Sequence, residues 1–284
     1  MIISKIYGGL GNQLFQYSLG RACAKKYSTE LFLDLSFYEL GKNSHPFVLD
    51  KFNVEYKLVT EREYQFLYTK NNYLRWKINN QYQKLLKYYN RKYILERKMG
   101  FDKNILKIKN NSILDGYWHS PVYFDKIVDV LKEELTLKEE SPNPDFKLLK
   151  SKISAGNTIS IHVRRGDYLK YNVELCSLDY YKTAIDMAAN HIGNSVFFIF
   201  SDDIEWCKQN FQFGHEFIFI EKKIGLMDYE EFLLMSYCKH NIIANSTFSW
   251  WAAWLNSNKT KQVFYPKFAL NVYKDIMFPD WIGI

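Results

Sequence analysis

Short apolar runs alternate with segments of helical periodicity along most of the chain. The apolar runs have the length of buried strands, and the other segments repeat apolar residues every three to four positions. We therefore predict strands at residues 2–7, 31–35, 112–115, 158–163, 195–200, 216–220, 241–244 and 262–265, and helices at 12–27, 60–69, 74–89, 121–135, 178–191 and 228–239. Because strands that alternate with helices usually pair in parallel, this order predicts an α/β fold.

A break in the pattern lies near the middle of the chain. A length of 284 residues is enough for two domains of ordinary size. The polar stretch 138–157 contains Pro142, Pro144 and Gly156, residue types that interrupt regular structure. We therefore predict two Rossmann-like domains, residues 1–150 and 151–284, with the last helix packing back on the first domain.

The composition excludes several classes of protein. A chain with 47% hydrophobic and 18% aromatic residues is too apolar for disorder. Its four cysteines lie far apart, which favours reduced thiols over disulfides or a zinc site. The first apolar run is too short for a signal peptide, and polar residues interrupt the uncharged stretch 241–258, so no membrane span is expected. These features together predict a cytoplasmic protein.

The positive charge of the chain is concentrated in one region. The formal net charge of +7 favours an anionic partner, and twelve of the 38 Lys and Arg residues lie between Lys70 and Lys109. The helical spacing at 74–89 predicts an amphipathic helix with a solvated basic face. The alternative is that residues 70–110 dock on the inner face of an anionic membrane or recognise a lipid-diphosphate acceptor.

A glycine-rich turn joins the first predicted strand to the first predicted helix. In the stretch GGLGNQLFQY, residues 8–17, Gly9 and Gly11 allow a ligand to approach the backbone closely, and the helix N-terminus favours an anion. The stretch lacks the third glycine of a dinucleotide fingerprint and the lysine of a P-loop. Asn12 and Gln13 place two amides where the strand ends, which is where α/β sheets bind ligands. The alternative is a plain strand-to-helix turn.

Two adjacent arginines follow the predicted strand at 158–163. A diphosphate leaving group needs fixed positive charge, and a guanidinium supplies it through two parallel hydrogen bonds. Because neighbours in a strand point in opposite directions, we expect one of Arg164 and Arg165 to face the phosphates and the other to be braced by Asp167. The alternative is a surface ion pair.

Two further polar groups follow predicted strands in the second half. Asp202 and Asp203 stand directly after a strand, but the two acids are adjacent and no histidine lies close in sequence. We therefore favour a hydrogen bond to a guanine ring or a ribose over a metal site, with helix N-capping as the structural alternative. In the stretch NSTFSWW, Ser246 or Thr247 can cap the following helix and can also hold a phosphate.

At these residues the chain resembles the α-1,2-fucosyltransferases of bacterial surface-glycan synthesis. The four matching stretches are GGLGNQLFQY (8–17), HVRRGDY (162–168), FSDD (200–203) and NSTFSWWAAWL (245–255), in the order found in the family. The resemblance implies two Rossmann-like domains facing a cleft, as in GT-B glycosyltransferases. It implies transfer of L-fucose from GDP-β-L-fucose, with inversion and without a metal or another cofactor, to a galactoside-type oligosaccharide or a lipid-linked glycan. Residues 36–150 match the family poorly, and we expect this region to select the acceptor.

The resemblance also assigns roles to individual residues. It implies that Arg164 holds the β-phosphate, that His162 lies beside the nucleotide and that Asn12 lies near the transferred sugar and the acceptor. Asp202 is expected at the nucleoside, and Ser246, Thr247 and Phe248 along the phosphates and the ribose. Further substrate contacts are expected at Gly9, Gly11, Gln13, Arg165 and Asn245.

The motif stretches do not single out one general base. GDP leaves without a proton, so one base suffices for the attacking hydroxyl. Asp167, Glu174 and Asp34 are the candidates. The alternative is late deprotonation of the acceptor, with Asn12 only orienting its hydroxyl.

Two other classes of protein fit single features. An NAD-dependent oxidoreductase would use the glycine turn and Asp34, but it leaves the two arginines and residues 245–251 without a role. A protein that binds polyanions would use the basic residues 70–110, but these contain no known nucleic-acid motif, so we expect no nucleic-acid partner. A transferase for another GDP-sugar or for a protein acceptor stays open.

Overall fold

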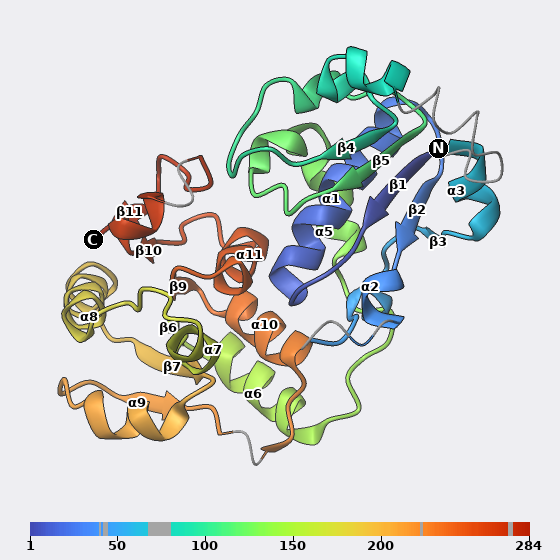
Figure 1. Cartoon of the computed structure of the whole chain (residues 1–284). Coiled ribbons are helices and arrows are strands. Elements are labelled where there is room, and N and C mark those ends of the chain that lie inside the picture. The colour runs from blue at the N-terminus through green and yellow to red at the C-terminus, as the bar shows by residue number, and fades with distance from the viewer. Residues whose placement is uncertain (40, 42–44, 68–80, 222–223, 272–274) are drawn as a thin grey trace. The chain divides into compact units, whose positions relative to one another are not determined.

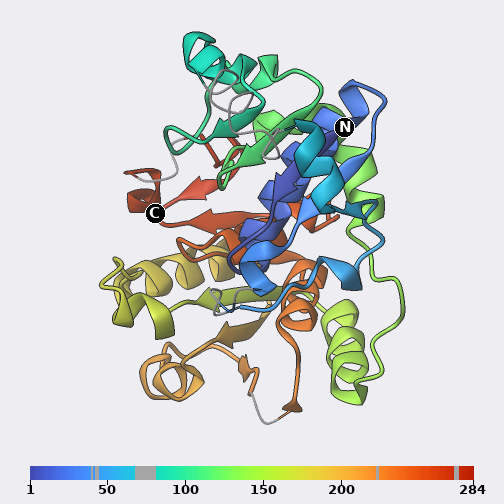
Figure 2. The same ribbon diagram turned by 45° about the vertical axis from the view of Figure 1, so that its right-hand side comes forward.

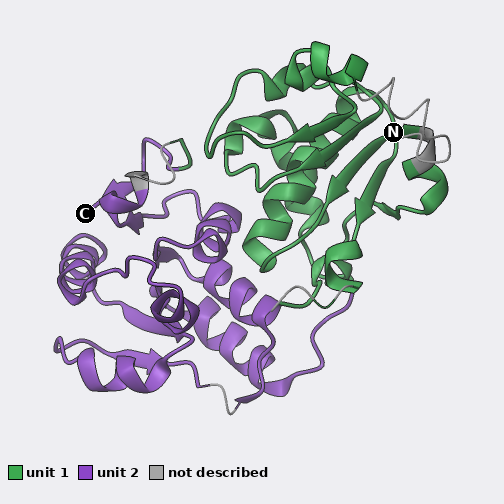
Figure 3. Cartoon of the chain, viewed as in Figure 1, with its two compact units in different colours: residues 1–138, 272–276 green, residues 139–271, 277–284 purple. Residues whose placement is uncertain are grey.

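The chain forms two compact units, each built around one parallel sheet (Figure 3). The computed structural model describes residues 1–39, 41, 45–67, 81–221, 224–271 and 275–284. Unit 1 consists of Met1–Lys138 and Val272–Ile276, and unit 2 of Glu139–Asn271 and Met277–Ile284. All named strands of the described residues pair in parallel, which confirms the predicted α/β class.

The sheet of unit 1 has the strand order β3-β2-β1-β5-β4, so the first strand of the chain lies in its centre (Figure 1). The elements of unit 1 are β1 (Ile2–Lys5), α1 (Leu10–Lys26), β2 (Leu31–Asp34), α2 (Ser36–Glu39), η1 (Leu49–Lys51), β3 (Lys57–Leu58), α3 (Glu61–Leu67), η2 (Tyr88–Asn90), β4 (Tyr93–Leu95), η3 (Ile105–Lys107), β5 (Ser112–Asp115), η4 (Pro121–Tyr123), η5 (Asp125–Ile127) and α5 (Val128–Glu134).

Helix α1 packs closely on one face of this sheet. The hydroxyl of Ser4 in β1 donates a hydrogen bond to the carbonyl of Gln16, at 2.8 Å. A Cβ at Gly20 would lie 2.8 Å from Leu31 and 3.0 Å from Ser4, so a larger residue here would require these side chains to shift. The tight contact fixes the start of α1, and therefore the glycine turn, at the end of β1.

The sheet of unit 2 has the strand order β11-β10-β9-β6-β7-β8. Strands β9 and β10, coloured orange to red, can be followed side by side in Figure 2. The elements of unit 2 are α6 (Pro144–Ala155), β6 (Thr158–Val163), α7 (Gly166–Lys170), α8 (Leu178–Ile192), β7 (Val196–Ser201), α9 (Ile204–Asn210), β8 (Phe217–Phe219), α10 (Asp228–Tyr237), β9 (His240–Ile242), α11 (Thr247–Leu255), β10 (Val263–Tyr265), η7 (Lys267–Asn271) and β11 (Ile282–Gly283).

Helices cover both faces of the second sheet. On one face, Ile159 and Ile161 of β6 pack against Tyr181 and Ile185 of α8 and against α9. On the other face, the ring of His162 lies 5.6 Å from that of Phe248 in α11. The residues of β6 are therefore buried on both sides, which explains its continuous apolar sequence.

Several local predictions need correction. The stretch 138–157 contains a helix, α6, whose N-cap is Asn143 and whose first position is Pro144, so this proline starts a helix rather than a loop. Residues 139–150 belong to unit 2. The single helix predicted at 121–135 is divided into η4, η5 and α5. The strands β3, β4 and β11 and the helices α7 and α9 were not predicted from the sequence.

The helix predicted at 74–89 lies partly outside the described residues. Of its described part, residues 81–85 are helical and Tyr88–Asn90 form the 3-10 turn η2, so the helix does not reach residue 89. Within the described ranges, no helix combines the length and the apolar character needed to cross a membrane. Cys23, Cys176, Cys207 and Cys238 are free and buried, as the spacing predicts.

Candidate active site

Three of the four motif stretches meet at one edge of the sheet in unit 2. Strands β9, β6 and β7 are neighbours and run in parallel, so their carboxyl ends lie at the same edge. Arg164 follows β6, Asp202 follows β7 and Asn245 follows β9. The sequence placed each of these residues at a strand end, and the sheet order now brings the three ends together.

Arg164 is held by two carboxylates at this edge. Its guanidinium lies 2.8 Å from Asp167 and 3.1 Å from Asp202. Burial lowers the pKa of Arg164, but the hydrogen bond to Asp167 and the charges of Asp202 and Asp167 outweigh burial, and the pKa is raised above its usual value. The expectation that Asp167 braces Arg165 is wrong, because Asp167 lies at i+3 from Arg164 on the first turn of α7 and pairs with it.

Arg165 points to a different set of partners. Its Nε donates to Asp203 at 3.1 Å, and its guanidinium lies 3.9 Å from the ring centre of Trp206 in α9. Asp203 also accepts a hydrogen bond from the backbone N–H of Trp206, which confirms the N-capping interpretation for Asp203. The two arginines thus contact separate partners, as the alternation of a strand predicts.

Asp202 is placed by a close approach of two loops. It accepts a hydrogen bond from the backbone N–H of Arg165 at 2.8 Å. A Cβ at Gly166 would lie 3.1 Å from the carboxylate of Asp202, which is tighter than most contacts allow. A residue with a side chain at position 166 would therefore require the carboxylate of Asp202 to shift by a few tenths of an ångström.

The loop after β9 is tied to the loops around β6. The hydroxyl of Tyr168 donates to the carbonyl of Asn245 at 2.9 Å, and the amide nitrogen of Asn245 donates to the carbonyl of Glu174 at 2.8 Å. Asn245 is 8% exposed, so its amide works mainly inside the protein. The side chain of Glu174, by contrast, is exposed.

The N-terminus of α11 forms the remaining part of this edge. Ser246 is the N-cap, and its hydroxyl accepts a hydrogen bond from the N–H of Phe248 at 3.3 Å. Thr247 is the first residue of the helix, and Phe248 contacts His162. Burial, with a smaller contribution from the charge of Arg164, lowers the pKa of His162 to about 3, so this ring is neutral at neutral pH.

The glycine turn of unit 1 forms a second strand-end site. Gly8 has a φ of +82°, and a Cβ there would lie 2.8 Å from the amide nitrogen of Asn12. Gly9 is the N-cap of α1, and Gly11 is buried in its first turn. The turn therefore needs glycine at position 8, so that Asn12 can lie against the backbone.

Gln13 holds this turn in place. Its amide nitrogen donates to the carbonyls of Gly8 and Pro46, at 3.0 and 2.8 Å, and its amide oxygen accepts from the N–H of Val48 at 3.0 Å. Gln13 is fully buried. Both donors of the amide are thus used within unit 1.

His119 lies against Asn12, although it belongs to none of the four motif stretches of the sequence. Its Nε2 is 3.1 Å from the amide oxygen of Asn12. Because an amide oxygen only accepts hydrogen bonds, Nε2 carries the hydrogen. Burial lowers the pKa of His119 to about 3, so the ring is neutral. The segment of His119 directly follows β5, which was predicted correctly, so its place at a strand end was the available signal.

Carboxylates and phenols line the same end of the unit 1 sheet. Asp115 lies 3.2 Å from the ammonium of Lys5 and accepts hydrogen bonds from the hydroxyls of Tyr7 and Tyr93. Burial raises the pKa of Glu96 despite hydrogen bonds from two backbone N–H groups.

Both carboxylate oxygens of Asp34, a candidate base, accept hydrogen bonds within unit 1. One carboxylate oxygen accepts from the N–H of Ser36 at 2.9 Å, and the other accepts from the hydroxyl of Tyr64. In the described part of the chain, no three His, Cys, Asp or Glu side chains form a group that could hold a metal ion. Metal independence remains a prediction.

Comparisons with known proteins place this geometry among glycosyltransferases. The model of glycosyl transferase family 11 matches residues 1–284. An α-1,2-colitosyltransferase of Escherichia coli is 35% identical over 267 residues, which cover 90% of this chain and 88% of that protein. The O-antigen biosynthesis glycosyltransferase WbnK of Escherichia coli is 32% identical over 99% of both chains. The human galactoside alpha-(1,2)-fucosyltransferase 1 is 26% identical over 60% of this chain and 52% of its own length.

Solved structures show the same fold. The NodZ α-1,6-fucosyltransferase soaked with GDP-fucose matches with a TM-score of 0.52 and 15% identity, over 89% of this chain and 91% of its own. Arabidopsis thaliana FUT1, as a mutant in complex with GDP, matches with a TM-score of 0.55 and 12% identity, over 93% of this chain and 70% of its own. These matches confirm the predicted glycosyltransferase fold class of two parallel α/β sheets.

Proposed function

Because the chain belongs to glycosyl transferase family 11, we propose that it transfers L-fucose from GDP-β-L-fucose to the 2-hydroxyl of a galactoside with inversion. The product is an α-1,2-linked fucoside. The family match agrees with the resemblance noted in the sequence. The names of the relatives support the linkage, since the human protein is a galactoside alpha-(1,2)-fucosyltransferase and an Escherichia coli relative is an α-1,2-colitosyltransferase.

The single observation that carries this proposal is the place of Arg164. It stands at the carboxyl end of a buried parallel strand, held by Asp167 and Asp202. Its guanidinium has five N–H donors, and two carboxylates fix its orientation before any ligand arrives. A fixed guanidinium at a strand end suits a diphosphate whose negative charge grows as the sugar leaves.

The leaving group receives support from two directions. The acceptor hydroxyl attacks the anomeric carbon in line with the departing diphosphate, and the C–O bond to GDP breaks without protonation of GDP. Arg164 stabilises the charge that develops on the β-phosphate. The N-terminus of α11, at Ser246, Thr247 and Phe248, adds the positive end of the helix dipole. Unit 2 is accordingly the proposed GDP-fucose domain.

Glu174 is the proposed base among the three candidates. Asp167 pairs with Arg164, and Asp34 is bound by Ser36 and Tyr64. The carboxylate of Glu174 is exposed and has no hydrogen bond or ion pair with any described residue. It is therefore the candidate that can accept a proton without losing a contact. Glu174→Gln should lower kcat at neutral pH and leave the affinity for GDP unchanged. A fall in GDP affinity with unchanged kcat would contradict this role.

Unit 1 is the proposed acceptor domain. His119 fixes the amide oxygen of Asn12 and so sets the direction of its N–H donors, which we assign to the sugar or to the acceptor hydroxyl. The acceptor is an oligosaccharide or a lipid-linked glycan of the cell surface, and the name of WbnK points to an O-antigen. The proposed location is the cytoplasm, with peripheral contact at the inner membrane face through residues 70–110.

A second candidate keeps the reaction and changes the donor sugar. The relative with 35% identity is an α-1,2-colitosyltransferase, so a GDP-linked colitose is the donor to compare with GDP-fucose. Colitose lacks the 3-hydroxyl of fucose, and the two donors therefore differ in one hydrogen-bonding group.

Calorimetry and product analysis test the proposal. We expect GDP and GDP-fucose to bind in EDTA, and UDP-galactose and NAD⁺ not to bind. Incubation of GDP-fucose with a β-galactoside should give an α-1,2-linked fucoside by NMR. If none of the GDP compounds binds, either with or without Mg²⁺ and a galactoside, the proposal is overturned. Turnover of GDP-colitose in preference to GDP-fucose would select the second candidate.

A further inference from the structure

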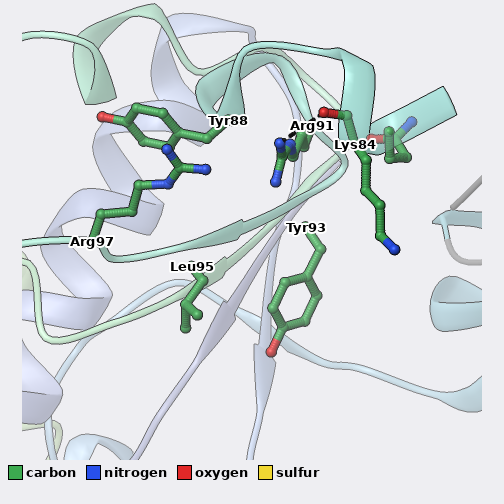
Figure 4. Close-up of a pocket in the computed structure, with 7 residues that line it drawn as sticks. Lys84, Tyr88, Arg91, Tyr93, Leu95 and Arg97 are labelled. Carbon is green, nitrogen blue, oxygen red and sulfur yellow. Dashed lines mark hydrogen bonds between the residues drawn. The ribbon is translucent and has the colours of Figure 1, made fainter. Parts of the chain in front are cut away.

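A small basic cavity lies at β4, the edge strand of the first sheet. It has a volume of about 280 Å³ and is formed by the segment from residue 83 to residue 97. Its lining residues are Gln83, Lys84, Tyr88, Arg91, Tyr93, Leu95 and Arg97, six of which are labelled in Figure 4. The lining contains three cations and no acid.

The guanidinium of Arg91 is fixed by the backbone around it. Its Nε donates to the carbonyl of Leu86 at 3.2 Å and its Nη2 donates to that of Lys84 at 3.1 Å. These bonds use two of its five N–H groups. The other three make no bond with any described residue, so they are available to a ligand in the cavity.

Arg97 is held in a different way. Its guanidinium lies 4.3 Å from the ring centre of Tyr88, and Figure 4 shows it against the face of that ring. The hydroxyl of Tyr88 donates in turn to Asp102, whose other oxygen accepts from Asn104. The ring is therefore anchored, while the N–H groups of Arg97 have no acceptor among the described residues.

No carboxylate lines this cavity, although Asp102 and Asp115 accept hydrogen bonds from the hydroxyls of two lining tyrosines, Tyr88 and Tyr93. Within the described ranges, none of Lys84, Arg91 and Arg97 forms an ion pair with a carboxylate. Cations that line one cavity repel each other, and a bound anion removes that cost. Guanidinium groups with free, oriented N–H donors bind phosphoryl oxygens through two parallel hydrogen bonds.

The remaining lining residues suit a sugar ring. Tyr93 and Leu95 stand two positions apart on β4 and so lie on one face of the sheet. Leu95 is 58% exposed although it is a large apolar residue in a strand. Apolar and aromatic faces beside a few fixed polar groups are typical of small-ligand sites, and the volume lies near their lower limit.

We propose that this cavity binds a phosphorylated saccharide, with the phosphoryl group at Arg91 and Arg97 and the sugar ring against Tyr93 and Leu95. The site is independent of the proposed function, because it involves neither Arg164 nor Asn12. A phosphoryl group has two sources in a cell, a soluble or lipid-linked sugar phosphate and the headgroups of a bilayer. The tyrosines and the apolar side chain of Leu95 in the lining favour the sugar phosphate.

Calorimetry on the full chain tests the site without any activity assay. The probe is α-D-galactose 1-phosphate. Galactose and inorganic phosphate, tested separately, are the controls for its sugar and its phosphoryl group. Saturating GDP is present throughout, so that binding at unit 2 does not contribute. We expect the sugar phosphate to bind more tightly than either half, and its affinity to fall with added salt.

Three variants distinguish binding in the cavity from attraction of the ligand by net charge alone. Arg97→Gln should weaken binding by about tenfold or more, as expected for the loss of charged hydrogen bonds. Lys98→Gln removes the same charge from an exposed neighbour that does not line the cavity, and it should have no effect. Leu95→Trp keeps the charge and fills the cavity, and it should abolish binding. All three variants should melt close to the wild-type temperature, because the side chains of Leu95, Arg97 and Lys98 are exposed.

Three outcomes would overturn the proposal. The first is equal weakening by Arg97→Gln and Lys98→Gln, which would mean attraction by net charge alone. The second is binding of inorganic phosphate as tight as that of the sugar phosphate. The third is Arg97-dependent binding to vesicles of anionic phospholipid with no binding of galactose 1-phosphate, which would assign the cavity to a bilayer.

Discussion

The two strand-end sites of this protein differ in how they hold their polar side chains. In unit 2, Arg164 and Arg165 are held by carboxylates that follow a neighbouring strand or begin the next helix. In unit 1, Asn12 and Gln13 are held by a neutral histidine and by backbone groups. A charged network suits a ligand that carries charge, and a neutral one suits hydroxyl groups. The same fold thus supplies two kinds of recognition.

The largest expected effect lies in the charged site. Arg164→Ala should lower kcat/KM by about 10²-fold or more, because one stabiliser of the transition-state charge is lost. Steady-state kinetics with GDP-fucose and a galactoside measure it. Arg164→Lys and Arg165→Lys are matched controls, and we expect the first to cost more activity than the second. Near-normal turnover of Arg164→Ala would remove Arg164 from the reaction.

The neutral site should show its largest effect in stability. Gln13→Leu leaves the carbonyls of Gly8 and Pro46 and the N–H of Val48 without their hydrogen-bond partner. It should therefore lower the free energy of unfolding by about 1–3 kcal/mol. Urea denaturation measures this, and Gln81→Leu on the exposed surface is the control. Equal effects of the two substitutions would show that the amide of Gln13 does not hold the turn.

A moderate effect on rate is expected at Asn12. Asn12→Ala should lower kcat/KM by about tenfold, the value of one well-placed hydrogen bond of about 1.4 kcal/mol. His119→Gln should lower it less, since a glutamine amide can still donate to Asn12. The affinity for GDP, followed by calorimetry, should not change in either variant. If GDP binding falls as far as the rate, the amide does not act on the acceptor side.

Acid should destabilise both sites through their histidines. The pKa values of His119 and His162 are lowered to about 3, whereas a histidine in the unfolded chain titrates near 6.5. The unfolded state therefore binds more protons below pH 6.5, so this stability is present above pH 6.5 and is lost as the pH falls toward 3. Between pH 6.5 and 5.5 each ring should cost about 1 kcal/mol.

Thermal melts at these two pH values measure the loss. In the variant His119→Gln, the loss of stability between pH 6.5 and 5.5 should be smaller than in the wild type by about 1 kcal/mol, the contribution of one ring. A wild-type protein as stable at pH 5.5 as at pH 6.5 would show that the rings are protonated in the folded state.

The last prediction is that removing divalent metal ions has no effect on activity. Activity should be unchanged in EDTA, because the charge on the diphosphate is assigned to Arg164 and the helix end. An assay with and without EDTA, followed by addition of Mg²⁺ or Mn²⁺, checks it. Activity that disappears in EDTA and returns with metal would transfer part of the charge stabilisation to an ion at the carboxylates.

The sequence predicted the sheet cores and the strand-end motifs well, because apolar periodicity and motif spacing are local. It did not predict which carboxylates pair with each arginine. The pairing of Arg164 with Asp202 depends on the order of β6 and β7 in the sheet. Short edge strands such as β4 and β11 also escaped prediction. Two or three residues carry too little pattern, and β11 forms only by pairing with β10.

Helix α6 shows a different kind of failure. Its first residue is Pro144, and the proline suggested a linker. The N-cap Asn143 directly before it accepts hydrogen bonds from Asp145 and Phe146, which is the chemistry of a helix start. His119 was missed because a single histidine has no spacing signal, and only the contact with Asn12 gives it a role.

The four buried cysteines have a practical consequence for following the two units separately. Burial raises the pKa of Cys23 to about 12 and that of Cys176 and Cys207 to about 11, so little thiolate forms in the folded protein. A thiol reagent therefore modifies these positions mainly when the surrounding structure opens. Because Cys23 belongs to unit 1 and the others to unit 2, mass spectrometry of labelled peptides reads the opening rate of each unit within one sample.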